Sequence, residues 1–260
     1  MDLLKSIARR KQLRLTIDDQ VWSKLEKVLK NFRIHFSKFT RNFIDAVLWK
    51  FRTGIPWRDM PKYFGPYSSI FNKFNRWSKR EIWKKLHHAL HIDIDNEWNF
   101  LDATIVRVHQ HASGAAGKKD EAIGKSVGGF TTKIHALVDA HGNPLEFVLS
   151  GGQVHDSVKA SELIELSDAE ILVADKAYHD QKIRDQASKK NIRTVIPVKK
   201  NSTDKSNPEF DSEIYKLRHL VENFFARIKH FRAIATRYDK TKRNYESGLH
   251  LACAYIWSKI

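Results

Sequence analysis

The sequence has almost no cysteine, since Cys253 is the single one among 260 residues. One thiol cannot close an intramolecular disulfide, so a disulfide framework is excluded, as is a zinc site built from cysteines. No run of about 18 apolar residues occurs, which is the length that a membrane-spanning helix needs. The first fifteen residues also lack a cleavable apolar core. We therefore expect a cytoplasmic protein with no membrane partner.

The sequence also lacks a fixed repeat, and its basic residues are interleaved with aromatic ones, which disfavours a disordered basic tail. What it has in excess is positive charge: 46 Lys and Arg against 30 Asp and Glu give a formal net charge of +16. Such a surplus favours a polyanionic partner, either nucleic acid or an acidic membrane surface. Residues 1–97 hold 21 basic and 10 acidic residues, whereas residues 98–260 hold 25 and 20, so the first third carries most of the excess.

The first third reads as a set of helices. Thr16, with Asp19 three positions later, makes a capping-box-like start, and Thr40 and Gly54 bound a second helix. A pair of helices separated by a glycine turn is predicted for about residues 57–80. This order of helix, tight turn and helix is the helix-turn-helix pattern of DNA-binding proteins.

The second helix of this pair has two different faces. Ile70, Phe71, Phe74 and Trp77 recur at helical spacing and predict the buried face. The outward face is rich in groups that reach phosphates and base edges: Ser69, Asn72, Lys73, Asn75, Arg76, Lys79 and Arg80. We predict that this face contacts DNA, and the alternative is an ordinary helical bundle with a solvated face.

From Trp98 onward, strands alternate with helices. Five segments read as strands, the first three antiparallel and the last two parallel, with helices beside them: 99–108, 131–138, 144–149, 171–174 and 192–198. A last amphipathic helix is predicted for about residues 244–259. This order indicates an α/β domain with a mixed sheet.

Three carboxylates occupy notable places in this part. Asp102 lies on the first strand, Asp175 directly follows the fourth, and Glu222 lies on an amphipathic helix predicted for residues 213–231. If the first and fourth strands are neighbours, Asp102 and Asp175 converge at the carboxyl ends of the strands, and Glu222 can close the site. Such an oxygen-rich site suits two Mg²⁺ ions, which can activate water and stabilise a leaving phosphate-ester oxygen.

Other polar residues have several interpretations. Asp139 is assigned to a hairpin turn, and Asp156 is predicted as a helix N-cap, with a place near the active site left open. Tyr215, Arg218 and Lys229 share a helical stripe with Glu222, which alone could be a solvated face with ion pairs. Five histidines after residue 98 suggest a zinc site, but no cysteine and no His-x3-His helix pair among them supports it. They are His109, His111, His135, His155 and His179.

Four stretches resemble motifs of a known family. They are GIPWRDMPKYFGPYSSIFNKFNRW, FLDATIVRVH, ILVADKAY and YKLRHLVENFFARIKHFR. The last fits the signature Tyr-x2-Arg-x3-Glu-x6-Lys. With these motifs, the sequence from about residue 17 to residue 258 resembles the DDE transposases of bacterial insertion sequences, in the IS five group of the IS four/five superfamily. It departs from many relatives in having Ala177 in place of glycine. Some members of the superfamily also carry a β-rich insertion before the helix with the glutamate, and residues 199–212 leave no room for one.

The resemblance implies an RNase H-like catalytic domain over residues 98–260 and an N-terminal all-α, helix-turn-helix-type DNA-binding domain over residues 1–97. It implies that Asp102, Asp175 and Glu222 are the catalytic residues. They would hold two Mg²⁺ ions, for which Mn²⁺ can substitute. It also implies that Arg218 and Lys229 contact phosphate and that Tyr215 positions DNA.

The implied activity is metal-dependent cleavage of DNA at the element's ends and strand transfer into target DNA. The implied partners are double-stranded DNA, as terminal inverted repeats and as target, and further copies of the chain in a homodimer or larger assembly, in the bacterial cytoplasm at the nucleoid. No small-molecule substrate is implied. The alternatives are an RNase H-like nuclease or resolvase without strand transfer, and an inactive DNA-binding regulator derived from a transposase.

Overall fold

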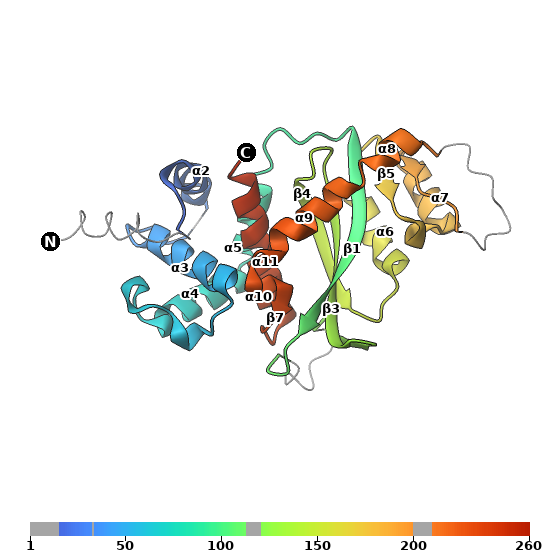
Figure 1. Cartoon of the computed structure of the whole chain (residues 1–260). Coiled ribbons are helices and arrows are strands. Elements are labelled where there is room, and N and C mark those ends of the chain that lie inside the picture. Colours follow the sequence, from blue (N-terminus) through green and yellow to red (C-terminus); the bar gives the residue numbers. More distant parts are fainter. Residues whose placement is uncertain (1–15, 33, 113–120, 200–209) are drawn as a thin grey trace. The chain divides into compact units, whose positions relative to one another are not determined.

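A computed structural model describes residues 16–32, 34–112, 121–199 and 210–260 of the chain (Figure 1). The chain divides into two compact units, which are described separately. Unit 1 comprises Met1–Leu90, His230–Ile234 and Ser247–Ile260, and unit 2 comprises His91–Lys229 and Ala235–Glu246. In the parts of the chain that the structure describes, no helix combines the length and the apolar character needed to cross a bilayer.

Unit 1 is helical. Its elements are α2 (Asp19–Lys30), α3 (Thr40–Thr53), the 3-10 turns η1 (Trp57–Asp59) and η2 (Lys62–Phe64), α4 (Tyr67–Lys79), α5 (Ile82–His88), most of α10 (Arg232–Ala235) and the later part of α11 (Lys242–Trp257). Its core is aromatic, because Phe51, Phe74 and Trp83 are almost completely buried and pack with ring centroids less than 6 Å apart. Large aromatic rings bury much apolar area, so they hold these short helices together.

The helix boundaries in unit 1 agree in part with the predicted ones. α3 begins at Thr40, and Gly54 ends it in the left-handed conformation with φ 77°, as predicted. α2 begins later than predicted, because Asp18 rather than Thr16 is its N-cap and accepts a hydrogen bond from the Val21 amide.

The segment expected as the first helix of the helix-turn-helix pair is not an α-helix. It consists of η1 and η2, separated at Met60 and Pro61. Proline has no amide hydrogen to donate and restricts the residue before it, so a continuous helix cannot pass this point. The second member, α4, is a regular helix.

Unit 2 is built on a mixed sheet in which β2 (Gly124–Ser126), β3 (Gly129–Val138), β1 (Trp98–Val108), β5 (Ile171–Ala174) and β6 (Arg193–Val195) follow one another. β4 (Pro144–Gly151) pairs with β3, and β7 (Thr236–Arg237) pairs with β1. The pairs of β3 are antiparallel, whereas β1 with β5 and β5 with β6 are parallel. The predicted fold class, a helical N-terminal region followed by a mixed α/β sheet, is confirmed. The RNase H-like character of that sheet stays a prediction.

The hairpin of β3 and β4 and the buried strand β5 lie where the sequence predicts them. Asp139 closes the hairpin turn by accepting hydrogen bonds from the amides of His141 and Asn143, so its structural role is confirmed. β2 is not among the strands predicted from the sequence, and residues 113–120, which precede it, are outside the described residues. β6 ends at Val195, three residues earlier than predicted.

In the described part of unit 2, five helical elements precede β7: α6 (Asp156–Glu165), η3 (Lys176–Tyr178), α7 (Gln181–Lys189), α8 (Ser212–Lys216) and α9 (His219–Lys229). The single helix predicted for residues 213–231 is therefore wrong, because a turn at Leu217 and Arg218 divides it. The amides of Leu217, Arg218, Leu220 and Val221 bond to the carbonyl three residues earlier, which tightens the chain at this point. Most of the loop before α8, residues 200–209, is outside the described residues.

The two compact units do not follow one cut of the chain, because two C-terminal segments belong to unit 1. The division into a DNA-binding domain of residues 1–97 and a catalytic domain of residues 98–260 stays a prediction. Residues 1–97 alone would lack the α11 residues that are counted in the helical unit.

Candidate active site

Asp102 and Asp175 are brought together by the pairing of β1 with β5. The two strands are parallel, and the last residues paired in their register are Leu101 and Ala174. Asp102 is the next residue of β1 and Asp175 directly follows β5, so both carboxylates lie at the same level of the sheet. The condition on which their convergence depended, that these strands are neighbours, is fulfilled.

Arg218 joins this pair to Glu222. Its Nη1 donates to Asp102 Oδ2 at 3.0 Å, and its Nη2 donates to Glu222 Oε1. A planar guanidinium can bridge two carboxylates in this way, whereas an ammonium cannot present two fixed donors. Arg218 therefore lies among the carboxylates, although its place on the predicted stripe suggested a phosphate contact beside them.

Burial makes Asp102 an unusual acid. Desolvation raises its pKa from 3.8 to about 6, while the Ala103 amide and Arg218 act in the opposite direction and Asp175 and Asp156 add to the rise. The side chain is 19% exposed. The charged form of Asp102 is therefore incompletely compensated by the residues around it, and a further cation at the carboxylate would stabilise it.

Asp175 is held by the turn that follows it. Its side chain caps η3 and accepts a hydrogen bond from the Ala177 amide. Ala177 is not among the residues with positive φ, so a side chain at this position causes no backbone strain. Tyr178 is completely buried nearby, and desolvation, with the charges of Asp102, Asp156 and Asp175, raises the pKa of its hydroxyl.

Lys229 reaches the strand that carries Asp102. Its Nζ donates to Thr104 Oγ1 at 2.6 Å, and desolvation there lowers the pKa of the ammonium. Thr104 is two residues from Asp102 and therefore shares its face of β1. Tyr215 lies close to Arg218, whose guanidinium is 5.9 Å from the ring centroid. The signature residues thus gather on one face of the sheet, and their DNA contacts stay a prediction.

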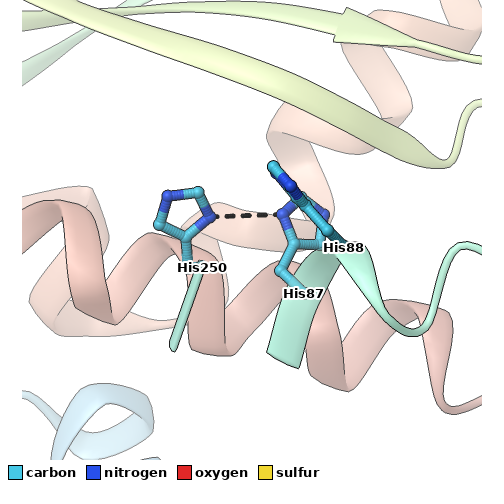
Figure 2. A group of neighbouring side chains, drawn as sticks. All are labelled: His87, His88 and His250. Carbon is cyan, nitrogen blue, oxygen red and sulfur yellow. Dashed lines mark hydrogen bonds between the residues drawn. The ribbon is translucent and has the colours of Figure 1, made fainter. Parts of the chain in front are cut away.

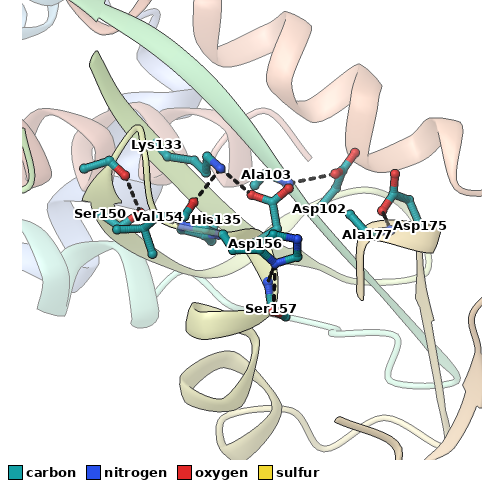
Figure 3. A network of polar contacts seen from close by, with 12 residues as sticks. Asp102, Ala103, Lys133, His135, Ser150, Val154, Asp156, Ser157, Asp175 and Ala177 are labelled. Atoms are coloured by element: carbon teal, nitrogen blue, oxygen red, sulfur yellow. Dashed lines mark hydrogen bonds and ion pairs between the residues drawn. The ribbon is translucent and has the colours of Figure 1, made fainter. Parts of the chain in front are cut away.

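An ion pair between a buried lysine and a half-buried aspartate beside the site was not predicted. Lys133 of β3 donates to the Val154 carbonyl at 2.7 Å and pairs with Asp156 Oδ1 at 2.7 Å (Figure 3). Asp156 is the first residue of α6, and His155 is the N-cap, so the predicted N-cap role of Asp156 is wrong. β3 is buried from Thr131 to Val138, and a charged lysine inside such a mainly apolar strand was the signal that could have revealed the pair.

Three of the histidines considered for zinc have other contacts. His109 and His111 pack against each other with ring centroids 4.6 Å apart, and His135 Nε2 lies 2.8 Å from Ser150 Oγ. Burial lowers the pKa of His135 to about 4, so its ring is neutral at pH 7.

The outward face predicted for α4 is exposed for the most part. Its exposed members are Ser69, Asn72, Arg76, Lys79 and Arg80, and Asn75 is half-buried. Lys73 does not point to solvent as predicted, because its Nζ lies 4.5 Å from the ring centroid of Phe43 and 5.3 Å from that of Trp77. A cation over aromatic faces is stabilised there and is not available to a partner in the same position.

The acidic side chains of the site have the donor type of a hard divalent cation. Asp102, Asp175 and Glu222 offer carboxylate oxygens from separate elements, which is the ligand type that Mg²⁺ and Mn²⁺ take. Within the described residues, however, these three are not a group whose ligand atoms all lie within 4.8 Å of one another. The pKa of Asp102 is raised even though Arg218 is beside it, so this cation does not offset the cost of desolvating the charged carboxylate.

Comparison with known proteins shows which family the sequence of this chain matches. Residues 98–257 match the sequence profile described as a transposase DDE domain, and residues 17–87 match that of a transposase family of IS4/5 type. The transposase assigned to insertion sequence element IS6501 of Brucella ovis is 39% identical over 128 residues, which are 49% of this chain and 98% of the relative. The one assigned to IS402 of Burkholderia cepacia is 27% identical over 142 residues, which are 50% of this chain and 64% of the relative.

Among solved structures, the piggyBac transposase in a synaptic complex with hairpin DNA is similar with a TM-score of 0.37 and 11% identity, over 73% of this chain and 50% of that one. A pre-cleavage Mos1 transpososome is similar with a TM-score of 0.28 and 12% identity, over 97% of this chain and 83% of that one.

Proposed function

This chain belongs to the DDE transposase family, and from that premise we propose that it cleaves DNA at the ends of an insertion sequence and joins the freed ends to target DNA. Family membership implies phosphoryl transfer with divalent metal ions. The observation that carries the proposal is the adjacency of Asp102 and Asp175 on parallel strands, with Arg218 linking Asp102 to Glu222.

Asp102, Asp175 and Glu222 are the residues that would hold the metal, as two Mg²⁺ or Mn²⁺ ions. When bound, the ions would activate the attacking hydroxyl and stabilise charge on the leaving oxygen. Asp175 would keep its orientation through the Ala177 amide, and Asp102 through the Ala103 amide. These two bonds hold the carboxylates at fixed positions before metal enters, which reduces the cost of ordering the site.

Arg218 would offset part of the negative charge of the three carboxylates in the metal-free protein. Its two bonds keep Glu222, which is 53% exposed, close to the more deeply buried Asp102. Lys229, fixed to Thr104 on the same face, is suited to a phosphate group of the bound strand. Tyr215 beside Arg218 would position the DNA.

Recognition of the element's ends would fall mainly on the basic helical region. Four exposed residues of α4 and its C-cap, Asn72, Arg76, Lys79 and Arg80, offer donors to phosphates and base edges. Because most of the excess positive charge lies in residues 1–97, binding should weaken steeply with salt. On DNA the protein would act as a homodimer or larger assembly.

Single-turnover cleavage by the full chain tests the proposal. The substrate is a linear fragment that carries one end of the element with its flanking DNA, incubated with a supercoiled target plasmid and Mg²⁺. Wild type should yield free 3′-OH ends and joined products. Asp175→Asn and Glu222→Gln should yield neither while still shifting the fragment in a gel, and Glu213→Gln is the matched control because its carboxylate is exposed and pairs with Lys216.

The alternatives predict different products. An RNase H-like nuclease or resolvase would give cleaved ends but no joined DNA. An inactive regulator would bind the fragment and give no cleavage in any divalent cation. Cleavage by Asp175→Asn at a rate near that of wild type would exclude the assigned site.

A further inference from the structure

Three histidines of unit 1 converge at one point. His87 and His88 are the last two residues of α5, and His250 lies on α11 (Figure 2). His87 Nδ1 and His250 Nδ1 are 3.2 Å apart, and one ligand nitrogen from each ring lies within 4.8 Å of the others. His87 and His250 are buried, and His88 is half-buried. All three belong to the same compact unit.

These distances are close to those of a metal site. Imidazole nitrogens bind zinc at about 2.0–2.1 Å, so two nitrogens of a tetrahedral site are roughly 3.3 Å apart. His87 and His250 already have this separation. The third nitrogen must approach by only about 1.5 Å, the difference between 4.8 Å and that spacing, which side-chain rotation can supply.

We propose that His87, His88 and His250 form a Zn²⁺ site that joins α5 to α11. Neutral imidazole is a ligand for zinc and related transition metals, whereas Mg²⁺ and Ca²⁺ prefer oxygen. The site is therefore chemically distinct from the carboxylate cluster and selects a different ion. Three protein ligands leave one tetrahedral position for water.

The plain alternative is a hydrogen-bonded histidine pair in a helical core. His87 and His250 alone would satisfy that description, since one ring can donate its proton to the other. It gives no reason for a third imidazole at the same point, yet the ring of His88 is 5.4 Å from that of His87 and 6.1 Å from that of His250 by centroid. Three convergent imidazoles are one of the ligand sets with which proteins bind zinc.

The consequence would be a stronger link between distant parts of the sequence. His87 and His250 are 163 residues apart, and the metal would hold the N-terminal helices and the C-terminal helix of unit 1 together. A ligand that binds only the folded state of a protein stabilises that state by mass action. Free Zn²⁺ at about 100 times its dissociation constant should raise the melting temperature by roughly 5–10 °C.

The test uses the untagged full chain, freed of metal with a chelator. Isothermal titration with Zn²⁺ should give one high-affinity site, Mg²⁺ should give none there, and Co²⁺ should produce the visible absorption of a tetrahedral complex. His88→Gln and His250→Gln should each weaken binding about tenfold or more, because a lost ligand costs at least as much as a lost supporting contact. His88 is the safer position, since it is only half-buried.

Two controls separate this site from the other groups. His141→Gln changes an exposed histidine of unit 2, and Asp102→Asn changes the carboxylate cluster, so both should keep the zinc affinity and the thermal shift. Absence of zinc binding, or binding that survives both His88→Gln and His250→Gln, would overturn the proposal and leave a hydrogen-bonded core pair. Neither result bears on strand cleavage, which depends on other residues and another ion.

Discussion

Replacing Asp102 by asparagine should make the metal-free protein more stable while it removes cleavage. Burial raises the pKa of Asp102 from 3.8 to about 6, even with Arg218 at 3.0 Å. Above pH 6 the folded protein therefore holds a carboxylate charge that costs more in the fold than in the unfolded chain. Asparagine keeps the size and can still accept from the Ala103 amide, but it carries no charge.

The size and sign of the effect follow from proton linkage. A rise of about two pKa units corresponds to about 3 kcal/mol at neutral pH. Between pH 3.8 and about 6 the folded state binds more protons than the unfolded state, so the stability contributed by this group is complete below pH 3.8 and is lost as the pH rises through 6. We expect Asp102→Asn to be more stable by about 1–3 kcal/mol at pH 7.5 and equal to wild type near pH 4.

Urea unfolding of both proteins in chelator, at several pH values from 4 to 8, measures this difference. The corresponding melting temperatures should differ by roughly 2–10 °C at pH 7.5. Added Mg²⁺ should stabilise wild type above pH 6 and have little effect on the variant, because a cation at the carboxylate removes the cost of its charge. Asp168→Asn, at an exposed position, is the control and should show no pH-dependent difference.

One result would refute the reasoning. If Asp102→Asn were less stable than wild type by the same amount at pH 5 and pH 8, the charged carboxylate would be a net stabilising partner of Arg218. The site would then be an ordinary structural ion pair, and the argument for a cation from the burial of Asp102 would fail.

Three further outcomes are expected. Arg218→Lys keeps the charge but cannot bridge two carboxylates, so single-turnover cleavage should fall about 10-fold to 100-fold with a shifted Mg²⁺ midpoint; an unchanged midpoint and rate would contradict the bridging role. Lys133→Met leaves Asp156 without its ion-pair partner and should lower the free energy of unfolding in urea by about 2 kcal/mol or more, part of which Asp156→Asn should restore in the double variant. Gly248→Ala places a methyl group 2.0 Å from the Phe51 ring, so it should cost about 1–3 kcal/mol in the same assay, and a neutral effect would mean that the core of unit 1 is looser than described.

Local features of this protein could be predicted from the sequence. Thr40 and Gly54 bound α3, and the apolar run of residues 171–174 is β5 with Asp175 directly after it. Such features depend on side chains within one or two turns of each other, so the preference is contained in a short stretch. Motif spacing then pointed to the carboxylates by resemblance, and their roles stay predictions.

Contacts between distant residues depended on the tertiary structure. The sequence could state only that Asp102 and Asp175 would meet if two strands were neighbours, because strand order follows from packing of the whole sheet. The turn at Leu217 was missed because the apolar periodicity continues through it, and with it the bridge from Arg218 to both carboxylates. The spacing of apolar residues predicts a single helix at a time. The contact of His87 with His250 needs two helices to pack whose residues are 163 positions apart in the sequence, and no local pattern predicts such packing.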